Sequence, residues 1–264
     1  MKKFSFYLFC AFIFFGCQPK ESDSTTSEWQ TLFNGKDLTG WTPKIAGYEV
    51  GNNFGNTFRV EDGILKVDYS EYPDSFAKRF GHLFYETPYS DYHLKIEYRF
   101  VGEQKLGNGE ELEWAFKNSG VMFHAQSAES MELNQGFPVS LEGQFLGGNG
   151  EDDRPTANLC TPGIHVYLAD TLTRNHCISS DAPTFHGEEW VNFEIIVHHD
   201  SIIHHIVNGD TVISYTQPTI GGGFLPENYP DSIGTPVKKG YFALQSESHP
   251  IEFRKVELLD LEQN

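Results

Sequence analysis

Two short segments decide the fold: NSGVMFHAQ (118–126) and VSLEGQFLGG (139–148). Successive side chains of a β-strand point to opposite faces of its sheet, so residues two apart share a face. In the second segment this rule places Glu142 and Gln144 together, facing away from the apolar residues. In the first segment it places His124 on the polar face. The sequence therefore predicts two strands that each present one apolar and one polar face.

The polar face of these strands has two interpretations. A carboxylate, an amide and a histidine on neighbouring strands could bind a sugar or transfer a proton. Consecutive strands are often neighbours in space, so we expect His124, Glu142 and Gln144 to line one pocket. A solvated sheet face would show the same alternation, and the pattern alone leaves both interpretations open.

The rest of the folded chain also predicts strands. Aromatic residues make up 14% of the chain and glycines number 25, which is typical of many short strands joined by tight turns. Asp62-Gly63 and Asn208-Gly209 predict hairpin turns. Residues 29–264 are thus expected to form one all-β domain, an antiparallel two-sheet sandwich of the jelly-roll type. Further strands are expected at 58–67, 92–100, 190–198, 202–207, 211–215, 240–247 and 251–259, and loops at 102–114, 147–162 and 220–229.

Residues 1–16 are typical of a signal peptide. A basic start precedes a mostly apolar run (4–15), which is too short for a permanent membrane span. Gly16-Cys17 at its end resembles the lipobox of bacterial lipoproteins, in which the cysteine is lipidated. The polar residues 17–28 are expected to form a flexible tether. These features predict a lipid-anchored protein of the cell envelope, periplasmic or on the outer-membrane face, with an ordinary cleaved signal as the alternative.

The net charge limits the expected partners. It is −18 at pH 7, and a field of this sign repels nucleic acids and anionic lipid headgroups. No second apolar run of membrane length follows the signal segment, so the lipid is the only membrane contact that we expect. The charge fits a domain that acts on neutral ligands, and we expect no nucleic-acid partner.

Two cysteines lie in the expected domain, Cys160 and Cys177. An exported domain folds in an oxidising compartment, which makes a disulfide between them the expected state. The alternative is a pair of metal ligands, and it lacks the CxxC spacing of such sites.

Common catalytic motifs are missing from the sequence. It has no GxSxG, no HExxH, no P-loop and no GxGxxG before a helix. His198-His199 and His204-His205 are neighbours on predicted strands, so they point to opposite faces and cannot form one compact metal site. No cofactor is therefore expected. A metal bound by His124, Glu142 or loop carboxylates stays open.

Glycoside hydrolysis normally needs two carboxylates. Glucanases with this kind of sandwich carry Glu-x-Asp-x-x-Glu on one strand, whereas this chain has EGQFLG (142–147) in the equivalent place. A double-displacement mechanism on that strand is therefore not expected. Another group must activate the bond, or the protein only binds its ligand.

Eight segments in order along the chain resemble the 3-keto-disaccharide hydrolase family, whose domain is a concanavalin-like or glucanase-like jelly roll. They cover nearly the whole expected domain. The chain departs from the common pattern at EGQ (142–144), where no Asp follows, and at CTPGIHVY (160–167). The segments are LFNGKDLTGW (32–41), FRVEDGILKV (58–67), YSDYHLKIEYRF (89–100), NSGVMFHAQ (118–126), SLEGQFLGG (140–148), EEWVNFEIIV (188–197), HHIVNGDTVISY (204–215) and GYFALQSESHPIEFRKVELLDL (240–261).

The resemblance implies an enzyme that cleaves 3-keto-glycosides and so has a carbohydrate substrate. A ketone at C3 acidifies the proton at C2, so one base can start an elimination of the C1 substituent, and water then adds to the product. His124 or Glu142 would be the base. The alternatives are a non-catalytic carbohydrate-binding sandwich and a structural lipoprotein. The side chains expected to hold hydroxyl groups or the enolate oxygen are Gln144, Arg99, Asn118 and His165.

The lipobox prediction can be tested with the Cys17→Ser variant. Because the lipid would be attached to the Cys17 thiol, the variant should be released from membranes or keep its signal segment. Membrane fractionation and the mass of the mature protein measure both outcomes. Normal processing with unchanged membrane retention would contradict the prediction.

Overall fold

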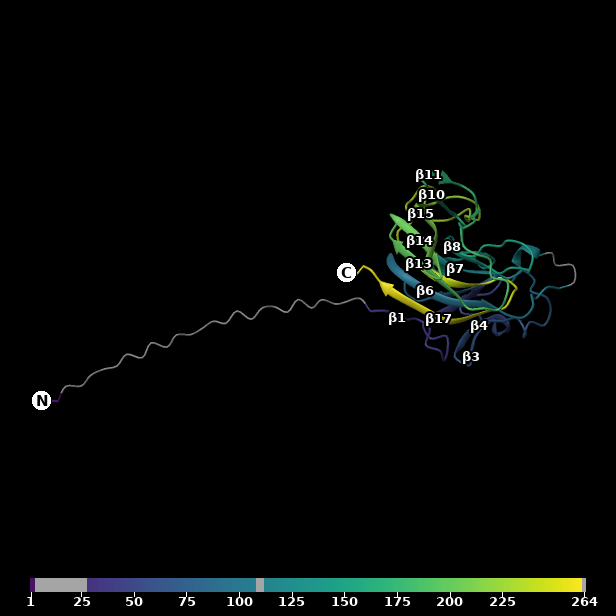
Figure 1. Cartoon of the computed structure of the whole chain (residues 1–264), viewed down its shortest axis with the longest axis horizontal. Helices are drawn as coiled ribbons and strands as arrows, with labels where there is room; N and C mark the ends of the chain where they lie inside the picture. The colour runs from purple at the N-terminus through teal and green to yellow at the C-terminus, as the bar shows by residue number, and fades with distance from the viewer. Residues whose placement is uncertain (3–27, 108–111, 263–264) are drawn as a thin grey trace.

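The computed structural model describes residues 1–2, 28–107 and 112–262. The apolar run, Cys17 and all but the last residue of the expected tether lie outside the described residues. Two antiparallel β-sheets pack face to face, as the sequence predicts (Figure 1). None of the helices among the described residues is long and apolar enough to cross a membrane.

The larger sheet has ten strands, and the smaller sheet has seven. In spatial order the larger sheet consists of β11 (Thr171–Thr173), β10 (Ile164–Leu168), β15 (Asp210–Ile220), β14 (Ile202–Val207), β13 (Val191–His198), β6 (Asp91–Phe100), β17 (Ile251–Asp260), β4 (Ile64–Val67) and β3 (Phe58–Glu61), with β1 (Gln30–Thr31) paired to β17. The smaller sheet consists of β12 (Cys177–Ile178), β9 (Asn158–Cys160), β8 (Leu141–Leu146), β7 (Asn118–Ala125), β16 (Tyr241–Ser246), β5 (Gly81–Tyr85) and β2 (Trp41–Ile45). Three short 3-10 turns are η1 (Phe54–Asn56), η2 (Glu113–Ala115) and η3 (Ala128–Ser130).

The two predicted hairpin turns are confirmed. Asp62 and Gly63 have φ of 53° and 78°, and Asn208 and Gly209 have φ of 50° and 95°. Positive φ at both central residues matches the twist of the flanking strands, and Asp, Asn and Gly tolerate it better than other residues. These turns connect β3 to β4 and β14 to β15.

The inner faces of the two sheets form the core. Phe145 of β8 stacks on Tyr98 of β6 with a centroid distance of 4.0 Å, and it contacts Phe193 of β13 edge to face at 4.9 Å. All three rings are buried. Because Phe145 points inward, its neighbours Gln144 and Leu146 must point to the outer face of the smaller sheet.

The prediction of one continuous loop at 147–162 is partly wrong. Residues 158–160 form β9, which pairs with β8 on one side and with β12 on the other. The strands β2 and β5 were not predicted either. All of these strands are short, and their pairing partners lie far away in the sequence, so local patterning does not reveal them.

The predicted disulfide is confirmed. Cys160 of β9 and Cys177 of β12 are directly paired across the two strands, with a Cα–Cα distance of 4.1 Å. Cys160 is buried and Cys177 is exposed. The bond therefore fixes the edge of the smaller sheet, close to the outer face of β8.

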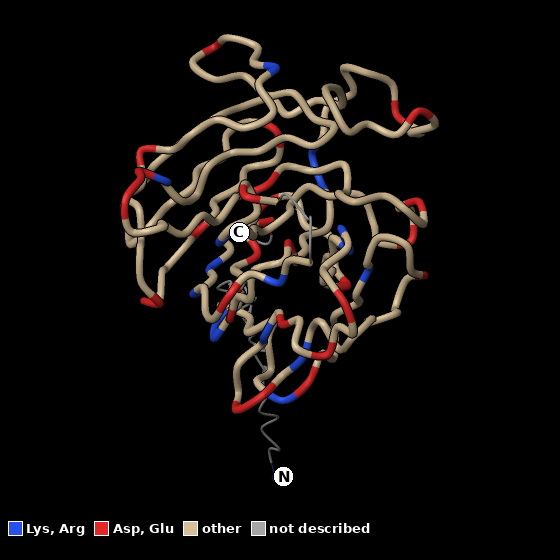
Figure 2. Tube along the Cα trace, turned by 90° about the vertical axis from the view of Figure 1, so that its right-hand side faces the viewer, with Lys and Arg blue, Asp and Glu red and all other residues tan. Residues whose placement is uncertain are grey.

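Acidic residues are spread around the molecule in Figure 2, along strands and loops on all sides of the view. This distribution agrees with the net charge of −18. Any site that holds carboxyl groups in this protein therefore lies in a field that disfavours further negative charge.

Removing the disulfide should destabilise the protein. In the chain-entropy model, closing a loop of this size stabilises by about 3 kcal/mol, so a Cys160→Ala/Cys177→Ala variant should unfold at lower denaturant concentration. Urea unfolding of the variant measures the loss, and the wild type under reducing conditions is its matched control. An unchanged unfolding midpoint would contradict the prediction.

Candidate functional site

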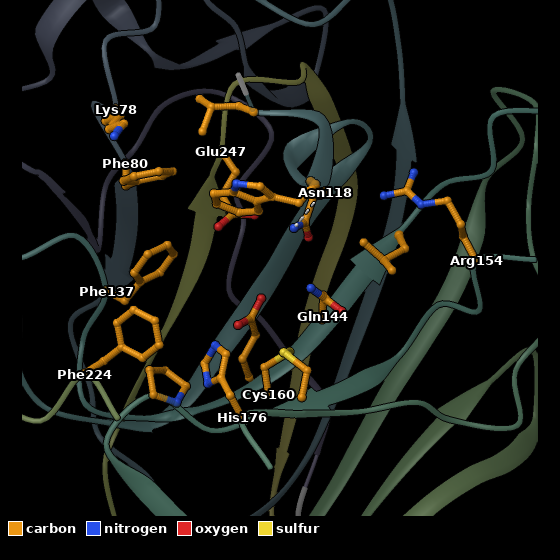
Figure 3. A pocket seen from close by; sticks show the side chains of 16 residues that line it. Lys78, Phe80, Asn118, Phe137, Gln144, Arg154, Cys160, His176, Phe224 and Glu247 are labelled. Carbon is orange, nitrogen blue, oxygen red and sulfur yellow. Dashed lines mark hydrogen bonds between the residues drawn. A yellow bond between two sulfur atoms is a disulfide. The ribbon is translucent and has the colours of Figure 1, made fainter. Parts of the chain in front are cut away.

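A cavity of about 700 Å³ lies over the outer face of the smaller sheet. Its floor consists of side chains from β7, β8 and β9, and loops from other parts of the chain form its walls (Figure 3). The lining residues are Lys78, Phe80, Leu112, Trp114, Asn118, Phe137, Glu142, Gln144, Leu146, Arg154, Cys160, Pro162, His176, Cys177, Phe224 and Glu247.

Glu142 lies on β8 at the floor of this cavity, and only 5% of it is exposed. It is paired across the strands with Met122 and Cys160. Its carboxyl group lies over Gly120 of β7, where a Cβ atom would come within 2.7 Å of the Glu142 Oε1 atom. The glycine therefore provides the space into which the carboxyl group fits.

Glu247 follows β16 and brings a second carboxyl group to the cavity. The turn that holds it is tightly fixed: Ser248 has a φ of 86°, and its backbone N–H donates to the Tyr69 hydroxyl at 3.0 Å. The same hydroxyl hydrogen-bonds Ser246 Oγ at 3.0 Å. A non-glycine residue keeps such a φ only when its surroundings hold it there, so Glu247 is firmly positioned.

Burial changes the acidity of both carboxyl groups. It raises the pKa of Glu142 to about 8, and the nearby Gln245 amide weakens this shift. Burial also raises the pKa of Glu247 well above its ordinary value, and the negative charge of Glu142 raises it further. Two buried carboxyl groups that interact in this way resist double ionisation, because two negative charges in this cavity would repel each other.

Unpartnered polar atoms surround this carboxyl pair. Within the described part of the chain, the Asn118 Oδ1 atom, both amide atoms of Gln245 and Glu247 Oε2 are buried without a hydrogen-bond partner at ordinary geometry. Gln245 thus acts on Glu142 from nearby, but its geometry falls short of a hydrogen bond. Both ring nitrogens of His82, which faces Gln245 across the strands, are also unpartnered. Buried polar groups normally have partners, so this concentration marks a place for a polar ligand.

His82 is neutral at the pH values at which the carboxyl groups titrate. Burial lowers its pKa to about 3, and the charge of Lys44 lowers it as well. Lys44 is itself buried and donates to the carbonyl oxygens of Ile45, Tyr48 and Leu133 at 3.0–3.2 Å. His82 therefore does not exchange protons in the pH range in which the carboxyl pair does.

Two of the predicted binding residues lie in the cavity. Gln144 lines it, and its Oε1 atom accepts from Asn158 Nδ2 at 3.1 Å, which directs its amide nitrogen away from Asn158. Asn118 also lines it, with a long contact of 3.4 Å from Nδ2 to the Trp114 carbonyl. Figure 3 shows both side chains on the side of Arg154. Glu142, Gln144 and Asn118 are thus brought together.

The expected shared pocket of His124 and Glu142 is wrong. β16 and β7 pair Tyr241 with Ala125 and Ala243 with Met122, so one extra residue of β7 forms a bulge. His124 lies in this bulge with a φ of 46°, which interrupts the alternation. Its ring contacts Tyr92 of the other sheet, and its Nε2 atom hydrogen-bonds the His199 carbonyl at 3.0 Å.

Arg99 and His165 also lie outside this cavity. The Arg99 guanidinium forms an ion pair with Glu252 at 2.7 Å and stacks on Trp190 at 4.6 Å. His165 lies on β10 of the larger sheet and packs against Gly221 and Gly222. The sequence pattern gave each residue a polar position, but it could not say which sheet would carry the cavity.

One group of residues within the described ranges could hold a metal ion: Asp91, His199 and Glu262, whose ligand atoms lie within 4.8 Å of one another. None of the three lines the cavity. The adjacent residues His204 and His205 point to opposite faces, as the sequence predicts. His204 hydrogen-bonds Ser214, whereas His205 is buried against Tyr215 and the Ala157 carbonyl.

The sequence analysis missed Glu247 as a site residue. A signal was present, because Gln245 and Glu247 are two apart at the end of the strand expected at 240–247, as Glu142 and Gln144 are on β8. The second carboxylate is therefore supplied by a different strand, not by the EGQFLG run (142–147) of the glucanase-like pattern. The register explains this, because β16 is the neighbour of β7, and β7 is the neighbour of β8.

A family model and one solved structure agree with this architecture. Residues 28–259 match the model of the 3-keto-alpha-glucoside-1,2-lyase-like domain. A putative glycosyl hydrolase from Parabacteroides distasonis is similar in structure, with a TM-score of 0.52 and 17% identity over 89% of this chain and 100% of that chain. A carbohydrate binding module, CBM66 from Bacillus subtilis, has a TM-score of 0.43 and 10% identity over 84% and 96% of the two chains. No curated protein sequence matched.

The carboxyl pair should make the protein less stable as pH rises. In the unfolded chain these groups ionise near their ordinary pKa, whereas the folded protein keeps their protons, so the unfolded state binds fewer protons. Between pH 4.5 and about 8 the free energy of unfolding should fall, by at most about 1.4 kcal/mol per pH unit for each group.

A Glu142→Gln variant should therefore show a weaker loss of Tm over this pH range than the wild type. Thermal unfolding at several pH values measures it, with Glu129→Gln at an exposed position as the matched control. Parallel curves for the wild type and Glu142→Gln would contradict the assignment of a raised pKa.

Proposed function

This chain belongs to the 3-keto-alpha-glucoside-1,2-lyase-like family, and from this premise we propose that it cleaves 3-keto-glycosides by eliminating the substituent at C1. The observation that carries the proposal is the buried pair of Glu142 and Glu247 in one cavity. An elimination needs a base for the proton at C2 and an acid for the leaving oxygen at C1. A carboxyl pair that has lost one of its two protons supplies both.

The proposed reaction proceeds in balanced steps. The ionised carboxylate takes the proton from C2, and the electrons of that C–H bond form an enolate with its charge on the C3 oxygen. These electrons then form the C1=C2 double bond as the bond from C1 to the leaving oxygen breaks. The protonated carboxyl group gives its proton to that oxygen. Addition of water to the resulting enone completes a net hydrolysis.

We assign the base to Glu142 and the acid to Glu247. The negative charge of Glu142 raises the pKa of Glu247. Glu247 therefore stays protonated when Glu142 is ionised, which supports this division. The raised pKa of Glu142 also makes its carboxylate a stronger base than an ordinary one. His124 has no role in this proposal, because it lies in the β7 bulge away from the cavity.

Amide groups would stabilise the enolate. Asn118 and Gln144 line the cavity with the carboxyl pair, and Gln245 acts on Glu142 from nearby. An amide N–H aimed at the C3 oxygen would bear the charge that develops there. The Gln245 Nε2 atom, which is held in place without a hydrogen-bond partner among the described residues, supports this role. Such preorganised donors need no reorganisation during the reaction.

We further propose that the enzyme acts at the cell envelope, tethered through a lipid on Cys17. The apolar run that ends at Gly16-Cys17 supports this location. The Cys160–Cys177 disulfide supports it independently, because structural disulfides persist mainly in oxidising compartments.

Substitution of the carboxyl pair should separate its two roles. Glu142→Gln should lower kcat for a 3-keto-disaccharide by about 10²- to 10⁴-fold, and it should also stop exchange of the C2 proton with deuterated water. Glu247→Gln should lower cleavage similarly but still permit exchange, because the base remains. NMR of the substrate in D₂O measures exchange and cleavage together.

Glu194→Gln on β13 is the matched control, since Glu194 is partly buried on the other sheet, and it should retain activity. The unoxidised parent disaccharide should not be cleaved by any of these proteins. If the wild type binds the 3-keto-disaccharide but neither exchanges nor cleaves it, the elimination is wrong and the non-catalytic carbohydrate-binding alternative is favoured.

A further inference from the structure

A continuous series of ring contacts runs along one wall of the cavity. Trp114 stacks on Phe80 at 6.0 Å, and Phe80 contacts Phe137 at 5.0 Å. Phe137 contacts Phe224 at 5.9 Å, and Phe224 contacts His176 at 4.7 Å. We call these five residues the aromatic arc. Figure 3 shows Phe80, Phe137 and Phe224 on one side of the cavity, opposite Asn118, Gln144 and Arg154.

Two members of the arc are exposed to an unusual degree. Trp114 is 51% exposed and Phe224 is 58% exposed. They come from separate loops, one at η2 and one after β15, and both line this cavity. Clustered exposed apolar side chains mark a binding surface more often than scattered ones do. The arc therefore offers an apolar contact surface to whatever fills the cavity.

The chemistry of the arc differs from that of the floor. The floor carries carboxyl and amide groups, which suit the hydroxyl and keto groups of a sugar. Three of the five arc residues are phenylalanines, whose rings can neither donate nor accept a conventional hydrogen bond. A second sugar ring on this wall would find few protein partners for its hydroxyl groups, and each hydroxyl group that loses water without gaining a partner would cost affinity. An aromatic group would stack on the rings without that cost.

We propose that the aromatic arc is the leaving-group subsite and that it selects 3-keto-glycosides of aromatic alcohols over those of small or sugar alcohols. This inference rests on the proposed function, because it assigns the floor to the keto sugar. The substrate is then amphipathic: its oxidised sugar lies on Glu142 and Glu247, and its aromatic aglycone lies against Phe137 and Phe224.

The test compares benzyl 3-keto-glucoside with methyl 3-keto-glucoside. Benzyl alcohol and methanol are leaving groups of similar acidity, so a difference in rate reports binding of the ring and not intrinsic reactivity. The benzyl substrate should have a kcat/KM at least about tenfold higher, mainly through KM. Phe224→Ala should reduce this ratio toward one, whereas Leu172→Ala, at another exposed apolar position outside the cavity, should not.

Equal kcat/KM values for the two substrates would overturn the subsite, as would a benzyl preference that survives Phe224→Ala. A 3-keto-disaccharide with a lower KM than the benzyl substrate would overturn it too. Calorimetric titration with unoxidised benzyl and methyl glucosides separates the subsite from the reaction. Benzyl binding that Phe224→Ala weakens, without turnover of any 3-keto-glycoside, would refute the proposed function and support the subsite.

Discussion

The site depends on the contact of Phe145 with two rings of the larger sheet, since it stacks on Tyr98 and meets Phe193 edge to face. It joins the central part of the smaller sheet to the larger one, and it fixes which face of β8 is inside. Side chains alternate along a strand, so the inward position of Phe145 places Gln144 on the outer face. Glu142 lies two residues before Gln144 and therefore shares that face. A shift of one residue in the register of β8 would bury both polar side chains in the core. Core packing therefore determines where the chemistry can occur.

The polar groups on the outer face of the smaller sheet lower the stability of the fold, and core packing must offset this loss. Two buried carboxyl groups lower the stability of the folded state, and so do a glutamine and a histidine that have no hydrogen-bond partner in the described part of the chain. The space over Gly120 is part of the same arrangement, because any larger residue there would displace the Glu142 carboxyl group. A protein without a ligand to bind would gain stability by replacing these groups. Glu142, Glu247 and Asn118 line one cavity and Gln245 acts on Glu142 from nearby, which argues that the unpaired polar atoms serve ligand binding.

The sequence predicts the features that local patterning controls. The hairpin turns at Asp62-Gly63 and Asn208-Gly209 follow from the φ values that these residues tolerate, and the shared face of Glu142 and Gln144 follows from alternation along β8. The position of His124 could not be predicted, because the bulge that turns it away depends on the pairing of β16 with β7. Glu247 was missed for a related reason. Its role becomes apparent only once β16 is known to lie beside the strand that precedes Glu142.

The floor and the arc are built from different parts of the fold, and this division has consequences for specificity. The floor residues lie on or directly beside paired strands, where hydrogen bonding and core packing restrict change. The arc residues lie mostly on connecting segments, which tolerate substitution far better. The disulfide links the two, since Cys160 pairs across the strands with Glu142, and Cys177 directly follows His176 of the arc. Under the proposed function, a fold arranged in this way can change the leaving group that it accepts while it keeps the carboxyl pair in place.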